Sequence, residues 1–188
     1  MSIVFIISGP SGSGKSSLVE SLLRSVSGLD FSVSHTTRLP RGSEQNGLAY
    51  FFVSTEEFER MAAADEFLEY AKVFGHYYGT ARRSLDKAKE QGHDLLLDID
   101  VQGASQLKEK APETVSIFVL PPDREELEWR LQSRGLDAKD VIQRRLAEAT
   151  QEMENYRTYD YVLVNNRLED CAEQLRKIVL TERERRSR

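Results

Sequence analysis

The chain has 188 residues, of which 39% are hydrophobic and 30% charged, and a formal net charge of −5 at pH 7. These values are typical of one globular domain with small insertions. The negative charge disfavours a general nucleic-acid or membrane-surface role, and we interpret the basic C-terminal stretch ERERRSR as the solvated end of a last helix. A single cysteine, Cys171, rules out a disulfide framework within this chain and favours a reducing compartment. We therefore expect a cytoplasmic protein with neither signal peptide nor membrane span.

Apolar runs alternate with helical patterns along the chain. The runs predict buried parallel strands at Ile3–Ser8, Phe31–Ser34, Asp94–Ile99, Val115–Leu120 and Tyr161–Val164. The helical patterns cover about 16–26, 81–91, 101–110, 123–134, 138–155 and 168–185, and Ser54–Glu57 and Asp123–Glu126 resemble capping boxes. This alternation predicts a three-layer α/β fold with a central parallel five-stranded sheet, whose ligands bind at the carboxyl ends of the strands.

Two regions interrupt the alternation. Residues 35–80 contain short strand patterns around LAYFFV and FLEYAKVFGHYYG with a helical pattern between them, which predicts a small α/β insertion. Residues 124–157 are rich in Arg and Glu with few apolar positions, which is typical of a mobile helical lid. The remaining segments, 1–34, 81–123 and 158–188, then form the core. We expect the insertion to hold an acceptor and the lid to close over the reaction.

The first predicted strand leads directly into an octet that fits the phosphate-loop motif G-x-x-x-x-G-K-[ST]. The octet consists of Gly9, Pro10, Ser11, Gly12, Ser13, Gly14, Lys15 and Ser16. Its glycines allow backbone N–H groups to point at phosphate oxygens, and the N-terminus of the following helix adds its dipole. Lys15 would neutralise the β- and γ-phosphates, and the Ser16 hydroxyl would ligate Mg²⁺. The octet therefore predicts a site for the phosphates of a nucleotide such as ATP.

A second buried strand, DLLLDID, ends in Asp98 and Asp100. Acids at the carboxyl end of a strand beside a phosphate loop can hold Mg²⁺ directly or through its water. Acids are common at strand ends, so this pattern alone is weak and gains its meaning from the phosphate loop.

The stretch SHTTRLPRGSEQNGLAYFF contains two arginines, Arg38 and Arg41, and a tyrosine, Tyr50. Arginines bind phosphate bidentately and a tyrosine hydroxyl adds one more donor. The stretch is also compatible with a surface loop of solvated charges. Taken alone, it leaves both interpretations open.

The spacing of this stretch, TTRxxRxxExxGxxYxF from Thr36 to Phe52, resembles the signature of guanylate kinases. GPSGSGKSS, FLEYAKVFGHYYGT, LLLDIDVQG and RLQSRG continue the resemblance in order over essentially the whole chain. The resemblance implies a P-loop NTPase core with a GMP-binding insertion and a lid. It also implies transfer of the ATP γ-phosphate to GMP with Mg²⁺, which gives ADP and GDP.

The resemblance also implies roles for individual residues. The GMP phosphate would be bound by Arg38, Arg41, Tyr50 and Tyr78. The guanine would be bound by Ser34, Glu69 and Thr80. Asp100 would lie near the nucleoside, Asp98 near Mg²⁺, and Asn165 beside the adenine of ATP. The residues that would carry catalysis are Lys15, Arg38, Arg130, Arg134 and Arg145.

Guanine chemistry agrees with this assignment. The Watson–Crick edge of guanine offers the donors N1–H and N2–H₂ and the acceptor O6. An ionised Glu69 accepts both donors, and the hydroxyl of Thr80 or Ser34 can donate to O6. Adenine would leave buried groups unpaired, which supports strong rejection. Two departures from the family pattern are Asn166-Arg167 after Asn165, which affects the adenine edge, and His35, which has no assigned role.

Several other residues receive no functional role. His35, His76 and His93 lack metal-ligand spacing, and we expect them in loops or on the surface. We expect Trp129 to pack within the lid and Cys171 to be a small buried or half-buried hydrophobe. Phe51, Phe52 and Phe58 are expected in the core of the insertion.

Other functions are weighed against the same residues. A catalytically inactive guanylate-kinase-like binding module is disfavoured because Lys15, Ser16 and the lid arginines are present. A different P-loop kinase is disfavoured by the acceptor stretch, and a switch GTPase by the lack of an Asn-Lys-x-Asp run. The expected partners are the small molecules GMP and ATP, with no nucleic acid and no membrane. The oligomeric state stays open.

Overall fold

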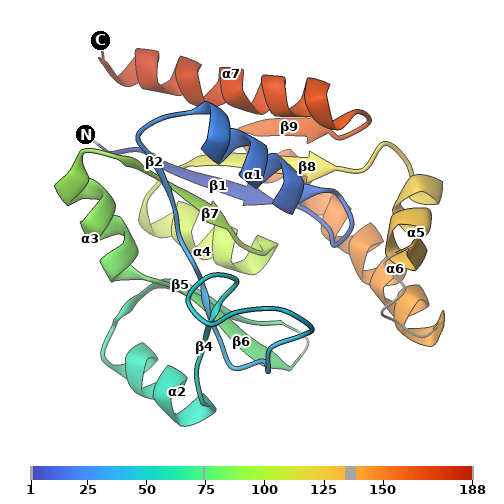
Figure 1. Cartoon of the computed structure of the whole chain (residues 1–188), viewed down its shortest axis with the longest axis horizontal. Coiled ribbons are helices and arrows are strands. Elements are labelled where there is room, and N and C mark those ends of the chain that lie inside the picture. The colour runs from blue at the N-terminus through green and yellow to red at the C-terminus, as the bar shows by residue number, and fades with distance from the viewer. Residues whose placement is uncertain (1, 74, 134–138, 188) are drawn as a thin grey trace. The chain divides into compact units, whose positions relative to one another are not determined.

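Consecutive apolar side chains build a five-stranded parallel sheet. The computed structural model describes residues 2–73, 75–133 and 139–187. Its larger sheet has the strand order β2-β7-β1-β8-β9 (Figure 1). The strands of this sheet are β1 (Val4–Ser8), β2 (Leu29–Phe31), β7 (Asp94–Asp98), β8 (Val115–Leu120) and β9 (Tyr161–Val164). The predicted α/β class and the central parallel sheet are confirmed.

Burial along the strands follows their place in this order. Nearly every residue of β1, β7 and β8 is buried, as expected for strands covered on both faces. In β9, at the end of the order, Val162 and Val164 are exposed while Leu163 is buried. The alternation in β9 is that of an edge strand with one covered face.

The second strand lies earlier in the chain than predicted. It runs over Leu29–Phe31 instead of Phe31–Ser34, because Leu29 pairs with Asp94, the first residue of β7. The Ser32 N–H still donates to the Leu96 carbonyl at 3.0 Å. After that bond the chain leaves this ladder, so Ser34 precedes β3 of the second sheet.

The helices begin and end close to the predicted positions. They are α1 (Lys15–Ser25), α2 (Thr55–Ala63), α3 (Arg82–Gln91), α4 (Val101–Lys110), α5 (Arg124–Ser133), α6 (Lys139–Met153) and α7 (Leu168–Ser187), with a 3-10 helix at Glu154–Thr158. Both predicted capping boxes are confirmed at their N-caps. The Ser54 hydroxyl accepts from the Glu57 N–H at 3.1 Å, and Asp123 Oδ1 accepts from the Glu126 N–H at 2.7 Å.

A second sheet lies between β2 and α3 in the chain, with the order β4-β3-β6-β5. Its strands are β3 (His35–Thr36), β4 (Phe51–Phe52), β5 (Phe67–Val73) and β6 (His76–Ala81). Phe58 and Met61 from α2 pack with Phe67 from β5, so α2 is anchored to this sheet (Figure 1). The strands and helix predicted for 35–80 are confirmed, whereas β3 was not predicted because two residues carry no periodic pattern.

The chain divides into two compact units. The first unit comprises Met1–Val4 and Gly28–Thr114, and the second comprises Phe5–Ser27 and Val115–Arg188. The first unit contains the small sheet with α2, α3 and α4. In the second unit α1 lies beside α7 (Figure 1), and Leu127, Leu131, Leu146 and Ala149 form a separate apolar cluster between α5 and α6.

Several side chains outside the expected sites depart from the sequence predictions. Trp129 does not pack within α5 and α6 but is 62% exposed, because Leu127 and Leu131 form the buried face of α5. His35 is not a surface residue but is buried in β3, stacked on Phe51 at a ring distance of 4.8 Å. Cys171 is buried as predicted, and burial raises the pKa of its thiol to about 11.

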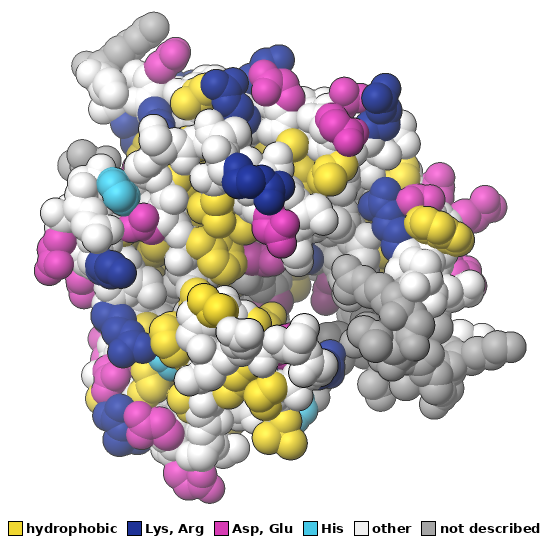
Figure 2. Space-filling model, viewed as in Figure 1, with side chains coloured by type: hydrophobic (Ala, Val, Ile, Leu, Met, Phe, Trp, Pro, Cys, Tyr) yellow, Lys and Arg dark blue, Asp and Glu magenta, His cyan; other side chains and the backbone are white. Residues whose placement is uncertain are grey.

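Charges of both signs are interspersed over the face of the molecule that Figure 2 shows. Such mixing is typical of a solvated surface. Among the described residues, no helix combines the length and the apolar character that crossing a membrane requires.

Candidate functional site

The phosphate loop joins β1 to α1 in the second unit. Gly12 and Gly14 have φ values of 90° and 91°, in the left-handed region that glycine adopts without strain. The helix α1 begins at Lys15, and within the described part of the chain no side chain caps its N-terminus. The N–H groups of its first turn are therefore oriented for an anionic ligand, as in other helix N-termini that bind phosphate.

Two loop glycines are also required by their neighbours. A Cβ on Gly9 would overlap the Val119 carbonyl oxygen, and a Cβ on Gly14 would overlap Nδ2 of Asn165. Gly12 packs against α5, where a Cβ would lie 2.9 Å from Cδ1 of Leu127. The loop is thus enclosed by backbone and side chains of its own unit, which fixes its path.

Lys15 extends back along the loop. Its ammonium donates to the carbonyls of Gly9 at 2.5 Å and Pro10 at 3.3 Å, and the Pro10 carbonyl also accepts from the Ser13 N–H at 3.1 Å. The positive charge of Lys15 therefore lies at the mouth of the loop. Ser11 is half-buried, and Ser16 is exposed in the first turn of α1.

Asn165 contacts the phosphate loop directly. It is 4% exposed, and its Nδ2 donates to the Ser13 carbonyl at 2.8 Å. The backbone carbonyl of Asn165 accepts from Nη2 of Arg130 at 3.2 Å, and Nε of Arg130 donates to Glu126 at 2.7 Å. Asn165 and Arg130 thus link the loop to α5.

Arg134 lies outside the described residues. Arg145 belongs to α6, but its side chain is also outside what the structure describes.

In the first unit, Arg38 is the centre of a polar cluster that follows β3. Its side chain is 7% exposed, and its two terminal nitrogens, Nη1 and Nη2, donate to the Glu44 carboxylate oxygens, each at 2.9 Å. Nε donates to the Tyr78 hydroxyl at 3.2 Å, and Nη1 also donates to the Leu39 carbonyl at 2.7 Å. The hydrogen bond with Arg38 lowers the pKa of Glu44, and the hydrogen bond with Glu44 raises the pKa of Arg38. Both groups are therefore held in their charged forms.

Glu44, which received no role in the sequence assignment, holds this loop together. Besides Arg38, its Oε2 accepts from the Arg41 N–H at 2.7 Å, while the Arg41 side chain is exposed. Glu44 thus fixes the backbone between the two expected phosphate-binding arginines. An acid three residues after Arg41 in a polar, arginine-containing loop was the available signal.

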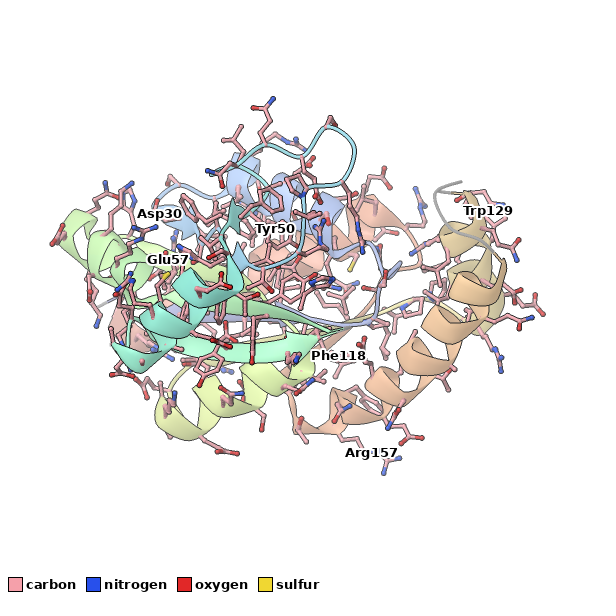
Figure 3. The ribbon with its side chains drawn as sticks, turned by 90° about the horizontal axis from the view of Figure 1, so that it is seen from below. Asp30, Tyr50, Glu57, Phe118, Trp129 and Arg157 are labelled. Carbon is pink, nitrogen blue, oxygen red and sulfur yellow. The ribbon has the colours of Figure 1, made fainter. Side chains whose placement is uncertain are left out.

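Tyr50 and Tyr78 lie beside this cluster. Their rings are 5.9 Å apart in an edge arrangement, and the Arg38 guanidinium lies 5.2 Å from the Tyr50 ring centroid. Figure 3 labels Tyr50 among the side chains drawn as sticks. Burial raises the pKa of Tyr50, and the nearby charge of Asp98 raises it further. The structure therefore brings Arg38, Tyr50 and Tyr78 together, with Asp98 within electrostatic reach.

Glu69 and Thr80 form a buried pair on adjacent strands. They are opposite each other in the antiparallel pairing of β5 and β6, so their side chains share one face. The Thr80 hydroxyl donates to Glu69 Oε1 at 2.6 Å, and Glu69 is only 2% exposed. Burial raises the pKa of Glu69 to about 7, and the charge of Asp100 also raises it, whereas Thr80 and Lys110 lower it. Glu69 is therefore a buried carboxyl group that can change its charge near neutral pH.

Asp98, the last residue of β7, and Asp100, two residues further on, have different surroundings. Asp100 is the N-cap of α4, and its Oδ1 accepts from the N–H groups of Gln102 at 2.7 Å and Gly103 at 3.3 Å. Asp98 is half-buried at the end of β7. Ser34 is half-buried between β2 and β3, and its carbonyl accepts from the Phe51 N–H at 2.9 Å. Among the described residues, no three His, Cys, Asp or Glu side chains gather as a metal site.

Comparison with known proteins gives this arrangement a family. The family model for guanylate kinase matches residues 1–182. The chain belongs to the guanylate kinase family. It is 61% identical over 187 residues to a guanylate kinase of Koribacter versatilis, a match that covers 98% of this chain and 80% of that protein. It is 48% identical over 187 residues to the Escherichia coli guanylate kinase, covering 98% and 90% of the two chains.

A solved structure supports the same conclusion. The crystal structure of guanylate kinase from Anaplasma phagocytophilum matches with a TM-score of 0.79 and 35% identity, covering 96% of this chain and 86% of that one. The guanylate kinase family resemblance drawn from the sequence is confirmed, and with it the prediction of a nucleotide-binding kinase, a phosphotransferase.

Proposed function

We propose that the protein transfers the γ-phosphate of ATP to GMP, giving ADP and GDP. The observation that carries this proposal is the buried Glu69–Thr80 pair in a member of the guanylate kinase family. An ionised carboxylate is an acceptor only, so Glu69 takes both N1–H and N2–H₂ of guanine. Because the Thr80 hydroxyl donates to Glu69, we assign the donor to guanine O6 to Ser34.

The GMP phosphate binds the cluster around Arg38. Arg38 and Arg41 supply bidentate charged donors, and the hydroxyls of Tyr50 and Tyr78 supply two more. In the structure Glu44 occupies two donors of Arg38. Binding of a phosphate therefore requires that Arg38 share its guanidinium between Glu44 and the phosphate oxygens. Asp100 binds the nucleoside.

The phosphates of ATP bind the loop Gly9–Ser16. Backbone N–H groups and the α1 N-terminus hold the phosphate oxygens, and Lys15 turns from the Gly9 and Pro10 carbonyls to the β- and γ-phosphates. Asn165, beside the loop, lies at the adenine side. Arg130, Arg134 and Arg145 approach the phosphates from the lid, residues 124–157, while residues 35–80 hold GMP.

Magnesium fits the residues assigned to it. Ser16 and Asp98 offer a hydroxyl and a carboxylate oxygen, which are the hard oxygen ligands that Mg²⁺ prefers. We assign these two residues to the ion, directly or through its water. When bound, Mg²⁺ neutralises charge on the β- and γ-phosphate oxygens.

The reaction needs no protein base, because the GMP phosphate is itself the nucleophile. One of its oxygens forms a bond to the γ-phosphorus as the bond from that phosphorus to the ADP oxygen breaks, in line. Lys15 and the arginines stabilise the charge on the moving group, and closure of the lid excludes water. We also propose a cytoplasmic location, which the single cysteine favours.

A coupled assay with ATP and Mg²⁺ tests the function. It compares GMP, dGMP, IMP and AMP as acceptors. GMP should have the highest kcat/KM, IMP a lower value because it lacks the 2-amino group, and AMP the lowest. Phosphorylation of AMP with an efficiency equal to that of GMP would contradict the proposal.

A further inference from the structure

The first turn of α4 passes close to the Glu69 carboxylate at a glycine. A Cβ built on Gly103 would overlap Oε2 of Glu69 and lie 3.0 Å from its Cδ. The same Cβ would lie 3.6 Å from Cδ1 of Ile99, an ordinary contact. The missing side chain of Gly103 is therefore the space that the Glu69 carboxylate occupies.

Neither α4 nor the strand that carries Glu69 can easily move to admit a larger residue. Side chains of α4 bind the carbonyls on both sides of Glu69. Gln106 donates to the Tyr70 carbonyl at 2.9 Å, and Lys110 donates to the Leu68 carbonyl at 3.2 Å. These two bonds fix the separation of α4 and β5 around Glu69.

The carboxylate itself is also held in position. Its other oxygen, Oε1, accepts from Thr80 at 2.6 Å, and the side chain is 2% exposed. A carboxylate displaced by a methyl group at position 103 would have to leave this hydrogen bond or enter packed protein. Either movement changes the direction in which its lone pairs point.

Helix propensity does not account for this glycine. Gly103 lies within α4 and is not among the residues with positive φ, so alanine would suit the backbone better than glycine. The contact with Glu69 is the feature of the position that requires the absence of a Cβ.

We propose that Gly103 is a specificity-determining positioning residue, whose missing side chain sets the place of the Glu69 carboxylate and thereby the preference for guanine. The inference rests on the proposed function, in which Glu69 accepts the guanine N1–H and N2–H₂. Gly103 acts through Glu69 and touches no reacting atom.

The test is Gly103→Ala, with kcat/KM measured for GMP and IMP at saturating ATP and Mg²⁺. GMP efficiency should fall about tenfold to a hundredfold, the range for misplacing a charged acceptor. IMP has no 2-amino group, so it should lose less, and the GMP/IMP ratio should shrink. The KM for ATP should stay within about twofold of its original value, as expected for a ground-state effect confined to the acceptor.

Ser105→Ala is the matched control. Ser105 is exposed on the same helix two residues further on, so its replacement also raises helix propensity but leaves Glu69 untouched. Its GMP/IMP ratio should equal that of the unaltered protein. A general loosening of α4 would instead lower both acceptor efficiencies together and leave the ratio unchanged.

A second variant connects the effect to the contact itself. Glu69→Asp withdraws the carboxylate by one methylene group, which makes room for a Cβ at position 103. Adding Gly103→Ala to Glu69→Asp should therefore change GMP efficiency by less than about threefold, far below its effect in the unaltered background. If Gly103→Ala alone does not fold, Glu69→Asp should restore folding.

The outcomes separate the two proposals. If the unaltered protein does not prefer GMP over IMP, the proposal that Glu69 binds the 2-amino group of guanine is wrong. If that preference is present, an unchanged ratio in folded Gly103→Ala overturns the role of Gly103. A fall in GMP efficiency on adding Gly103→Ala to Glu69→Asp as large as the fall in the unaltered background overturns it as well. So does a double variant that still fails to fold where Gly103→Ala alone fails.

Discussion

The phosphate loop and the acceptor region differ in the chemical groups that we expect to bind nucleotide, which are main-chain groups in the first and side chains in the second. In the phosphate loop the groups expected to bind phosphate are main-chain N–H groups, and Gly9 and Gly14 admit no side chain because Val119 and Asn165 lie against them. In the acceptor region the expected ligand-binding groups are side chains, and they bind one another. Arg38 binds Glu44 and Tyr78, and Thr80 binds Glu69.

The difference determines how each region responds to change. Main-chain groups do not titrate, and their directions are set by the fold. The acceptor side chains include a carboxyl group whose pKa is raised to about 7 by burial, and an arginine that shares its donors with an acid. We therefore expect donor binding to depend on single structural contacts, and acceptor binding to depend on charge and on pH.

The largest effect is expected at Lys15, the phosphate-loop side chain whose charge meets the transferred group. Lys15→Ala should raise the activation free energy by ~3–4 kcal/mol or more, because charge grows on the phosphoryl group in the transition state. This corresponds to a fall in kcat of about a hundredfold to a thousandfold or more. Circular dichroism should stay unchanged, since the loop path depends on glycines. A folded Lys15→Ala protein with near-normal turnover would sink the assignment.

On the acceptor side, Arg38→Ala and Arg41→Ala should each weaken GMP binding by ~1.5–3 kcal/mol, with far less effect on ATP binding. Arg38→Ala should also lower stability, because Glu44 loses its bidentate partner. Isothermal titration with each nucleotide measures both effects. Arg60→Ala is the control, since it removes only exposed ion pairs with Glu57 and Glu66. Unchanged GMP affinity in both variants would contradict the assignment of these arginines to the GMP phosphate.

The pH dependence should differ between the two substrates. Guanine binds ionised Glu69, so protonation below pH 7 should lower kcat/KM for GMP by about tenfold per pH unit. Asp100 and Lys110 are the charged groups that act on Glu69, the first raising and the second lowering its pKa.

The KM for ATP should change little between pH 6 and 7. Glu69→Gln removes this titration and keeps that of the GMP phosphate, so the difference between the two profiles isolates Glu69. Profiles of equal slope would show that Glu69 does not titrate in this range.

The smallest effect is expected at Asn165. Asn165→Ala removes one neutral hydrogen bond to the Ser13 carbonyl, worth ~0.5–1.5 kcal/mol. The KM for ATP should rise by a few-fold, with no change for GMP. If Asn165→Ala lowered the efficiency with ATP as donor but not with GTP as donor, that result would favour the adenine contact expected from the sequence.

The same comparison explains what could be predicted from the sequence. The phosphate loop was predictable because its backbone shape requires glycine at fixed spacings between a strand and a helix. The apolar runs likewise predicted the central sheet, since buried parallel strands need continuous apolar residues.

Side-chain partnerships were less accessible. The Glu69–Thr80 contact depends on the register of β5 and β6, which shifts between Phe67 and Glu69. The burial of His35 depends on a two-residue strand, and burial together with the charge of Arg83 lowers the pKa of this histidine to about 4. The spacing of Glu44 from Arg41 indicated its place in the loop but not its bidentate pairing with Arg38, and the contact of Gly103 with Glu69 depends on packing that spacing along the chain does not reveal.

The central claim is that the buried carboxylate of Glu69 accepts hydrogen bonds from N1–H and N2–H₂ of guanine. Its most direct test is kcat/KM for GMP and for IMP in the unaltered protein and in Glu69→Gln, at saturating ATP and Mg²⁺. Glutamine presents a donor where guanine also donates, so GMP efficiency should fall by ~1.5–3 kcal/mol, about tenfold to a hundredfold. IMP should lose less, which would narrow the GMP/IMP ratio. A ratio that stays the same in Glu69→Gln would contradict the account.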